Sequence, residues 1–302
     1  MKVLILGSGS NGGVPEWDCS CGNCSRARRQ KQHRRTRSSI VLTVDGKKHV
    51  LIDASPDLKA QLEASGLYPK DLKTRDHYER STSIDSILLT HGHGDHCTGI
   101  FELSTGKCFN IPVYASSDLI EYLFGTVVKP KFFRDLGRLA SDYVQPLTLQ
   151  ENTRISLLNG QIEAQGFEIP HTTVVNGACF PTKTYGYELI FNDKRLVYTP
   201  DLGDISESLL KRIEGSQLFI LDGTFWWEDE LERISGLKKT SQELGHIAME
   251  KSLDILRDVS IDRVVYTHMN HTNPILDPKS SLRSKLGQVG FKLAEDNQVI
   301  NI

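Results

Sequence analysis

The sequence predicts an α/β protein in which two β-sheets pack against each other and helices lie outside them. Short runs rich in β-branched and aromatic residues recur early and late in the chain, and turn sequences follow them. Two of these turns, DGKK at 45–48 and NDKR at 192–195, are hairpin signals. Amphipathic segments with helical spacing lie between the strands. Strands in both halves of the chain, separated by helices, favour two packed sheets.

The elements follow from this pattern in chain order. Strands are expected over 2–7, 38–44, 49–53, 85–90, 184–191, 196–199, 217–222 and 263–267. Helices are expected over 57–65, 116–124, 241–257 and 278–286. No segment rich in Pro, Gly or Ser divides the chain, so residues 1–302 are expected to form a single domain.

Composition and charge exclude several classes of protein. With 38% hydrophobic and 25% charged residues the chain is typical of soluble globular proteins, and its net charge of -2 gives no general attraction to nucleic acid or membranes. The N-terminal apolar run is too short for a signal peptide, and no stretch approaches the roughly 20 apolar residues that span a bilayer. We therefore expect a cytoplasmic protein. Six cysteines are too few for a disulfide scaffold, and three of them lie close together.

Polar side chains follow four of the expected strands. Asp53, His91, Asp201 and His268 each stand at the end of an apolar run. Side chains at strand ends are held by the sheet and yet open to a cleft, which suits a preorganised site.

The segment HGHGDH at 91–96 predicts a metal site. It contains His91, His93, Asp95 and His96 on a turn from strand to helix. The first two can face one point and the last two a second point nearby, which suggests two metals. Imidazole and carboxylate ligands suit zinc, iron or manganese and argue against a thiolate site for copper(I).

This motif after a buried strand resembles the signature of metallo-β-lactamase-fold proteins. The resemblance implies an αββα sandwich of two mixed sheets flanked by helices. It implies that one metal is held by His91, His93 and His171, a second by Asp95, His96 and His268, and both by Asp201. Two such metals lower the pKa of a bridging water and hold both the attacking and the leaving oxygen.

A separate metal is expected at 17–26, where WDCSCGNCSR places Cys19, Cys21 and Cys24 together. Three thiolates need a fourth ligand to close a tetrahedral zinc site, and the candidate is His271. This arrangement resembles one in related phosphodiesterases of the same fold, where it binds a structural zinc. Cys97, Cys108 and Cys179 lack such spacing and are expected to be core residues.

Longer strings narrow the resemblance. GSGSNGGVPEWDCSCGNC, RTRSSIVLTVDG, ASPDLKAQLEA, DGTFWWEDEL, LGHIA and NHTNPIL together resemble the pyrroloquinoline quinone (PQQ) synthesis protein B family from about residue 1 to about residue 280. That resemblance implies iron-dependent, oxygen-using hydroxylation of a tyrosine-derived substrate on the path to PQQ. The chain differs from some members in its fuller metal loop, and it has His271 where they often have asparagine.

These differences leave the reaction open. Asp95, His96 and His268 form a set that suits ferrous iron with open positions, whereas His91, His93 and His171 form a set that suits zinc hydroxide. The alternative is therefore a phosphodiesterase or other hydrolase that uses a metal-bridged hydroxide. A non-catalytic carrier of the quinone is a third hypothesis, against which the complete ligand set argues.

Other residues have two interpretations each. His246 in LGHIA, at the start of the predicted helix, is either a general acid or substrate contact, or a capping and packing residue. Asp222 is predicted to be a catalytic residue together with His246 and to orient a metal ligand, whereas Asp53 either orients a ligand or caps its strand. Phe225, Trp226 and Trp227 either line the pocket or belong to the core.

The segment 26–37 carries seven Lys or Arg residues and no acid. It is either a solvated loop or a flap that attracts an anionic substrate. We expect a small-molecule or short-peptide substrate of negative charge, and no membrane partner. Nucleic acid is not favoured, because no aromatic residues alternate with the basic ones. The sequence is compatible with a homodimer.

Overall fold

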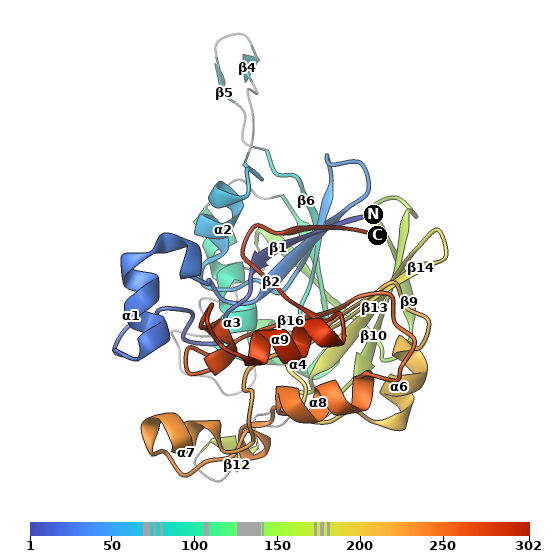
Figure 1. Cartoon of the computed structure of the whole chain (residues 1–302). Helices are drawn as coiled ribbons and strands as arrows, with labels where there is room; N and C mark the ends of the chain where they lie inside the picture. The colour runs from blue at the N-terminus through green and yellow to red at the C-terminus, as the bar shows by residue number, and fades with distance from the viewer. Residues whose placement is uncertain are drawn as a thin grey trace.

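Two β-sheets face each other and helices cover their outer faces, which gives a four-layered αββα arrangement (Figure 1). The computed structural model describes residues 1–68, 73–74, 77–78, 81–105, 109–125, 140, 142–171, 174–175, 178–179 and 182–302. The predicted architecture of two packed sheets with outer helices is confirmed.

The first sheet contains seven strands among the described residues. In spatial order they are β18 (Val299–Asn301), β1 (Lys2–Gly7), β2 (Ser39–Thr43), β3 (His49–Ile52), β6 (Ile84–Leu88), β7 (Ile111–Ala115) and β8 (Val144–Thr148). Strands β18 to β3 pair antiparallel, whereas β3, β6, β7 and β8 pair parallel. The chain ends lie together in this sheet, because the Met1 ammonium donates to the Ile302 carbonyl oxygen at 3.2 Å (Figure 1).

The second sheet is mixed in the same way. In spatial order its described strands are β17 (Lys292–Leu293), β16 (Val264–Thr267), β15 (Leu218–Asp222), β14 (Lys194–Thr199), β13 (Tyr185–Phe191), β10 (Ile162–Glu168) and β9 (Arg154–Leu157). The first four pair parallel and the last four antiparallel. Two short hairpins join β4 (Lys73–Thr74) to β5 (His77–Tyr78) and β11 (Val174–Val175) to β12 (Ala178–Cys179).

Both predicted hairpin turns form, and local chemistry explains them. Between β13 and β14, Asn192 and Asp193 have φ values of +46° and +62°, as a two-residue type I′ turn requires. Between β2 and β3, Asp45 Oδ1 accepts hydrogen bonds from the backbone N–H groups of Lys47 and Lys48 at 2.7 and 3.2 Å. Each turn therefore sets the register of the two strands that it joins.

Helices flank the two sheets and lie in the connections between strands. They are α1 (Gly22–Arg29), α2 (Leu58–Ala64), α3 (Gly94–Cys97), α4 (Ser117–Phe124), α6 (Glu207–Ile213), α7 (Glu230–Ser235), α8 (Met249–Leu256) and α9 (Leu282–Gln288), with 3₁₀ turns at Lys31–His33, Thr98–Thr105, Gln242–Leu244 and Pro274–Leu276. Within the described part of the chain, every helix is too short or too polar to cross a bilayer.

Alternating side chains build three apolar layers. In β1, Val3 and Ile5 face the space between the sheets, while Leu6 belongs to the apolar layer on the outer face that α2 and α4 cover. In β15, Ile220 lies between the sheets, while Phe219 packs against α6, α8 and α9. Because both faces of each central strand are buried, these strands are apolar throughout.

Two predicted helices differ from the structure. The single helix predicted over 241–257 is wrong, because Gly245 has a φ of +81° and ends a 3₁₀ turn before α8 begins at Met249. The helix predicted from residue 278 begins at Leu282 instead, because Asp277 Oδ1 accepts a hydrogen bond from Lys279 N and holds a turn there.

Candidate metal centre

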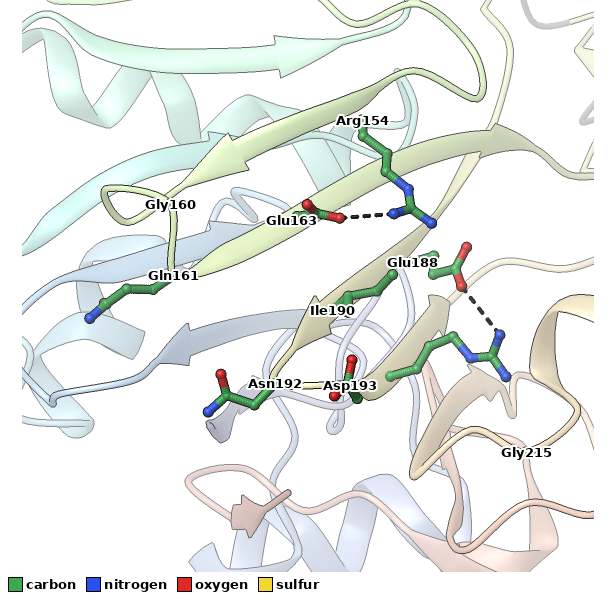
Figure 2. A pocket seen from close by; sticks show the side chains of 10 residues that line it. Arg154, Gly160, Gln161, Glu163, Glu188, Ile190, Asn192, Asp193 and Gly215 are labelled. Atoms are coloured by element: carbon green, nitrogen blue, oxygen red, sulfur yellow. Dashed lines mark hydrogen bonds and ion pairs between the residues drawn. The ribbon is translucent and has the colours of Figure 1, made fainter.

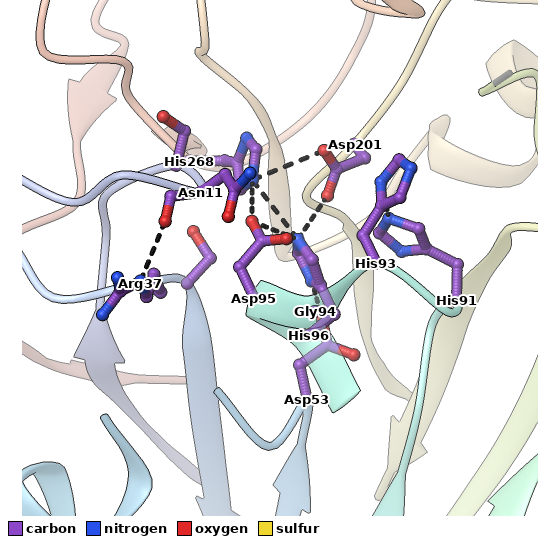
Figure 3. Close-up of polar contacts among 12 residues, drawn as sticks. Asn11, Arg37, Asp53, His91, His93, Gly94, Asp95, His96, Asp201 and His268 are labelled. Atoms are coloured by element: carbon purple, nitrogen blue, oxygen red, sulfur yellow. Dashed lines mark hydrogen bonds and ion pairs between the residues drawn. The ribbon is translucent and has the colours of Figure 1, made fainter. Parts of the chain in front are cut away.

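The predicted strand-end side chains meet at one edge of the sandwich. Asp53 follows β3, His91 follows β6, Asp201 follows β14 and His268 follows β16. Asp53 and His268 have left-handed backbone angles, with φ of +63° and +58°. Such angles cost non-glycine residues roughly 1–3 kcal/mol each and cluster at functional sites. The strand ends thus bring residues that are distant in sequence to one point (Figure 3).

A short helix carries half of the predicted motif. His93 is the N-cap residue of α3, and its carbonyl oxygen accepts a hydrogen bond from His96 N at 3.0 Å. Asp95 and His96 stand in the first turn of α3 and are buried. The prediction that this motif turns from strand to helix is confirmed.

Three histidines form one group of converging nitrogens. His91 Nε2 lies 2.8 Å from His93 Nδ1, and His171 Nε2 lies 3.4 Å from the same nitrogen. The ligand atoms of all three lie within 4.8 Å of one another. This group joins the motif to a residue that is distant in the sequence and follows β10.

A second group lies beside the first. Asp95 Oδ2 is 3.2 Å from His268 Nε2 and 3.3 Å from His96 Nε2, and the two nitrogens are 3.3 Å apart. These three side chains therefore converge as the resemblance implied (Figure 3).

Asp201 lies between the two groups. Its Oδ2 is 2.9 Å from His96 Nε2, and its Oδ1 is 3.4 Å from His268 Nε2 and 3.9 Å from His171 Nε2. Asp201 also forms a potential ligand group with His91 and His96. Oδ2 is buried and, apart from this contact with His96, has no hydrogen-bond partner among the described residues. A carboxylate in this position fits one that bridges two cations.

The outward nitrogens of four histidines are occupied. His96 Nδ1 lies 2.8 Å from Asp53 Oδ2, His171 Nδ1 lies 2.7 Å from the Gly245 carbonyl, and His91 and His268 use Nδ1 toward the hydroxyls of Thr90 and Thr224 at 2.9 and 2.8 Å. Protein metal sites use such contacts to fix the tautomer and ring direction of their histidines. Each of these four rings is thereby oriented with Nε2 toward the shared space.

Charge states in the site also fit a metal. Burial lowers the pKa of His171 to about 4, and burial together with His96 holds the pKa of His91 well below its ordinary value. Burial opposes ionisation of Asp95, but His96 and His268 hold its pKa well below the usual range. Neutral imidazole and ionised carboxylate are the forms that bind metals.

A positive charge is favoured at the centre of the group. Burial opposes protonation of His96, yet Asp201, Asp95 and Asp53 raise its pKa well above the ordinary value. Carboxylates thus lie on both sides of the buried His96 ring, with Asp53 at Nδ1 and with Asp95 and Asp201 at Nε2. The carboxylates that favour a proton on His96 would also stabilise a metal cation, so the residues present fit a metal.

His246 faces the cleft from the loop between the 3₁₀ turn and α8. Its Nδ1 lies 2.6 Å from Asp222 Oδ2 and 3.8 Å from Asp201 Oδ1. Burial opposes protonation, but Asp222 and Asp201 raise the pKa of His246. Asp222 itself is fully buried at the end of β15, where it also accepts from Thr224 Oγ1 at 2.6 Å. Asp222 therefore positions His246 and, through Thr224, His268.

A cleft of about 340 Å³ opens beside the metal-binding side chains. The lining residues are Ser10, Asn11, His93, Gly94, Asp95, Asp201, Thr224, Phe225, Leu244, His246, His268 and Asn270. Phe225 thus lines the pocket, whereas Trp226 is buried in the core and Trp227 packs partly against it. No described lysine or arginine lines the cleft.

A larger cavity of about 560 Å³ lies near the opposite end of the second sheet, where β14 begins (Figure 2). Its arginines are already paired, because Arg154 lies 2.9 Å from Glu163, and Arg195 lies 3.6 Å from Glu188. The histidine and aspartate groups described above include none of its lining residues. We therefore place the candidate site at the smaller cleft.

The cysteines of 17–26 gather with His271, as predicted. The sulfur atoms of Cys19, Cys21 and Cys24 and a ring nitrogen of His271 lie within 4.8 Å of one another, and Cys21 Sγ is 3.6 Å from His271 Nδ1. Burial, with the neighbouring Cys21 and Cys19, raises the pKa of Cys24 to about 12 in the absence of a cation. These residues therefore fit a closed zinc site, in which the metal stabilises the thiolates.

The remaining cysteines were predicted to be core residues. Cys97 is buried, and its Sγ lies 3.5 Å from the Gly92 carbonyl oxygen. Cys108 and the side chain of Cys179 lie outside the described residues. The prediction is confirmed for Cys97 only.

Sequence reasoning did not identify the groups that orient the histidines from behind, apart from Asp53 and Asp222. Thr90, Thr224 and the Gly245 carbonyl are common groups whose roles depend on contacts across the fold. Thr90 and Thr224 do lie within two residues of His91 and Asp222, which is the one available signal.

Hydrogen bonds link a buried carboxyl, that of Glu230, to the cleft. Glu230 Oε1 accepts a hydrogen bond from Thr272 Oγ1 at 2.6 Å, and Oε2 accepts from Trp226 N at 2.6 Å. Thr272 Oγ1 in turn accepts from Asn270 Nδ2, whose side chain lines the cleft. Burial raises the pKa of Glu230 from 4.5 to about 7.

This shift predicts how the stability of the fold depends on pH. The folded chain holds the Glu230 proton more tightly than the unfolded chain. The stability that the protonated carboxyl contributes is therefore lost as pH rises from about 4.5 through about 7. In the wild type, Glu230 should lower the free energy of unfolding by about 2 kcal/mol between pH 5.5 and pH 8. Glu230→Gln should abolish this decrease. Urea unfolding at both pH values measures it. Glu232→Gln, at an exposed position of the same helix, should show the wild-type change in the free energy of unfolding between the two pH values. The same change in Glu230→Gln would contradict the raised pKa of Glu230.

Comparison with known proteins agrees with the resemblance seen in the sequence. Residues 48–269 match the family described as Beta-lactamase superfamily domain. A coenzyme PQQ synthesis protein B of Methylorubrum extorquens is 31% identical, and the match covers all of both chains.

Solved structures extend the comparison. The crystal structure of Zn²⁺-bound PqqB from Methylobacterium extorquens has a TM-score of 0.88 and 30% identity, with both chains fully covered. A diphosphatase from the PhnP family has a TM-score of 0.69 over 99% of this chain and 97% of its own, and at 22% identity it shows only a shared fold. With this fold, the ligand-rich edge and full-length identity above 30%, the chain belongs to the metallo-β-lactamase superfamily and, within it, to the coenzyme PQQ synthesis protein B family.

Proposed function

We propose that the chain is a binuclear-metal enzyme of PQQ biosynthesis that oxidises a tyrosine-derived substrate by hydroxylation. One oxygen atom of O₂ enters the ring, and the other leaves as water with two electrons from an external reductant. The observation that carries this proposal is the complete set of seven converging ligand side chains on a chain related over its whole length to PQQ synthesis protein B. The pathway comes from the names of the relatives, and the reaction class from the ligand chemistry described below.

The proposed ligand sets follow the two groups of side chains. His91, His93 and His171 hold one metal, Asp95, His96 and His268 hold the second, and Asp201 is shared. A two-histidine, one-carboxylate set suits ferrous iron and leaves positions open for oxygen chemistry, whereas a three-histidine set suits zinc. The metals are divalent, and zinc, iron and manganese all fit these ligands.

The residues of the cleft bind and orient the substrate. Phe225 provides an aromatic wall against which a phenol ring packs, and Asn11 and Asn270 present amide groups. Asp222 accepts the Nδ1 proton of His246, so that His246 Nε2 remains available to exchange a proton with the substrate. A substrate with negative charge is proposed, because two divalent ions would exceed the charge of the two carboxylate ligands.

His246 also supports one alternative. A histidine that is held by a buried carboxylate and lines a cleft beside two metals can protonate a leaving group. The alternative is therefore a metal-dependent phosphodiesterase that uses the same ligands.

An experiment with defined metals distinguishes the two reactions. Protein purified without oxygen is loaded separately with ferrous iron, manganese and zinc. Each sample is then assayed, with added oxygen and with ascorbate as the reductant, on a tyrosine-containing peptide and on bis(p-nitrophenyl) phosphate. We expect oxygen uptake and ring hydroxylation with iron alone, reduced at least about 10²-fold in Asp95→Ala because that carboxylate completes the iron set. Asp204→Ala, which changes an exposed aspartate paired with Lys251, serves as the control.

The opposite result would favour the hydrolase. Cleavage of the phosphodiester with manganese or zinc, independent of oxygen and lost in His246→Ala, would overturn the proposed oxidation. The pathway assignment would then need a hydrolytic step instead.

A further inference from the structure

The basic segment 26–37 contributes to a third pocket, which shares no lining residue with the metal cleft. It forms part of α1, a 3₁₀ turn at Lys31–His33 and the chain leading into β2. Arg26, His33 and Arg35 line a pocket of about 250 Å³ together with Arg283 of α9 and Glu295. No described residue of this segment lines the metal cleft. Segments from both ends of the sequence therefore enclose the pocket.

Arg35 is the most buried charged group in this pocket. Its side chain is 9% exposed, and Nη1 donates to Ser8 Oγ at 2.6 Å and to the Ala294 carbonyl oxygen. Its Nε and Nη2 make no hydrogen bond with any described residue, and no described carboxylate lies within 4.0 Å. Burial lowers the pKa of Arg35, and Asp296 and Glu295 oppose that shift only in part. A buried guanidinium with unused donors is costly unless an anion approaches it.

The other charged residues around the pocket add to its excess of positive charge. Arg283 donates from Nε to the Ile275 carbonyl at 2.9 Å and forms no ion pair with a described residue. Arg26 is paired, because its Nη2 lies 3.0 Å from Asp277 Oδ1. Glu295 is the one acidic residue in the described lining and is exposed.

Asp296 is close by but already engaged. Its oxygens accept hydrogen bonds from Ser8 Oγ, Thr36 N and Thr36 Oγ1 at 2.7 to 2.9 Å. Three guanidinium groups thus share a small pocket with one exposed carboxylate in its lining.

We propose that this arginine pocket, lined by Arg26, His33, Arg35 and Arg283, binds the carboxylate or phosphate group of a small anionic ligand. Guanidinium groups recognise both kinds of oxyanion through paired, charge-assisted hydrogen bonds. The pocket has room for such a group with a short attached chain. This binding does not depend on the reaction proposed for the metal cleft.

Isothermal titration calorimetry of the metal-loaded protein with inorganic phosphate, and separately with malonate, tests the proposal. Each anion is titrated into the wild type, Arg283→Gln, Arg35→Gln and the control Arg154→Gln, whose guanidinium is paired with Glu163 in the second sheet. We expect at least one anion to bind, with affinity about tenfold or more weaker in Arg283→Gln and unchanged in Arg154→Gln. The anion that binds more tightly identifies the ligand class.

Binding of phosphate to the metal cleft must be separated from binding to the arginine pocket. Titrations are therefore repeated with Asp201→Ala, in which the metal cleft is disrupted and the arginine pocket is intact. Persistence of the Arg283-dependent binding supports the proposal. Loss of all binding in Asp201→Ala, unchanged affinity in Arg283→Gln, or failure of both anions to bind the wild type would overturn it. Arg283→Gln carries the test if Arg35→Gln fails to fold, because Arg283 is half-buried and makes a single hydrogen bond.

Discussion

Asp201→Ala is expected to lose metal from both halves of the proposed centre while the cysteine site keeps its zinc. Asp201 lies within 4 Å of ligand nitrogens in both groups, namely His96 and His268 on one side and His171 on the other. Changes that touch a ligand only indirectly cost 10- to 100-fold in metal affinity, so we expect a loss of at least about 100-fold for a shared ligand. Metal analysis by mass spectrometry after dialysis measures the content of each protein.

Asp204→Ala is the matched control for this change. It removes an aspartate three positions away whose carboxylate is exposed and paired with Lys251. This variant should keep the full wild-type metal content. If Asp201→Ala, with wild-type circular dichroism, also kept all of its active-site metal, the proposed bridging role would be wrong.

Cys21→Ser should lose about one equivalent of zinc and lower the melting temperature by at least about 5 °C, because structural zinc is coupled to folding. Cys21 Sγ lies 3.6 Å from His271 Nδ1 in the cluster of four side chains. The cluster also ties the N-terminal segment to the chain after β16, where Asn23 Nδ2 donates to the carbonyl oxygens of His271 and Asn273 at 3.0 and 2.9 Å. Zinc analysis and thermal unfolding check both parts.

Ser20→Ala provides the comparison, since Ser20 is an exposed residue between two of the cysteines. It should retain zinc and melt as the wild type does. Wild-type zinc content and melting in Cys21→Ser would exclude a structural zinc at this cluster.

Much of the fold could be predicted because strong local signals agree with it. The central strands, such as β15 and β16, are buried on both faces and are therefore apolar throughout. The turns at 45–48 and 192–195 contain residues whose backbone preferences select a hairpin. Where a segment is both apolar and bounded by turn residues, its conformation depends little on distant contacts.

Other elements gave no such signal. β7 and β8 contain Pro112 and Pro146, which weaken a strand prediction, yet the parallel pairing of β7 with β6 and of β8 with β7 holds them in the sheet. β17 and β18 are two and three residues long and exist only because they pair with β16 and β1. The predicted long helix over 241–257 was interrupted at Gly245, whose carbonyl orients His171. These outcomes depend on tertiary contacts that no local pattern encodes.

The same division holds for the site. The sequence by itself determined which side chains can bind metal, because the residue types and their close spacing at strand ends already identify imidazole, carboxylate and thiolate ligands. Only the tertiary structure decided their geometry. Parallel strands from two sheets bring Asp53, Asp201 and His268 to one edge, and Thr224 and Gly245 orient rings that lie up to 74 positions away. It also decided that Arg35, within an apparently solvated basic run, is buried, because burial depends on what the rest of the chain packs around a residue.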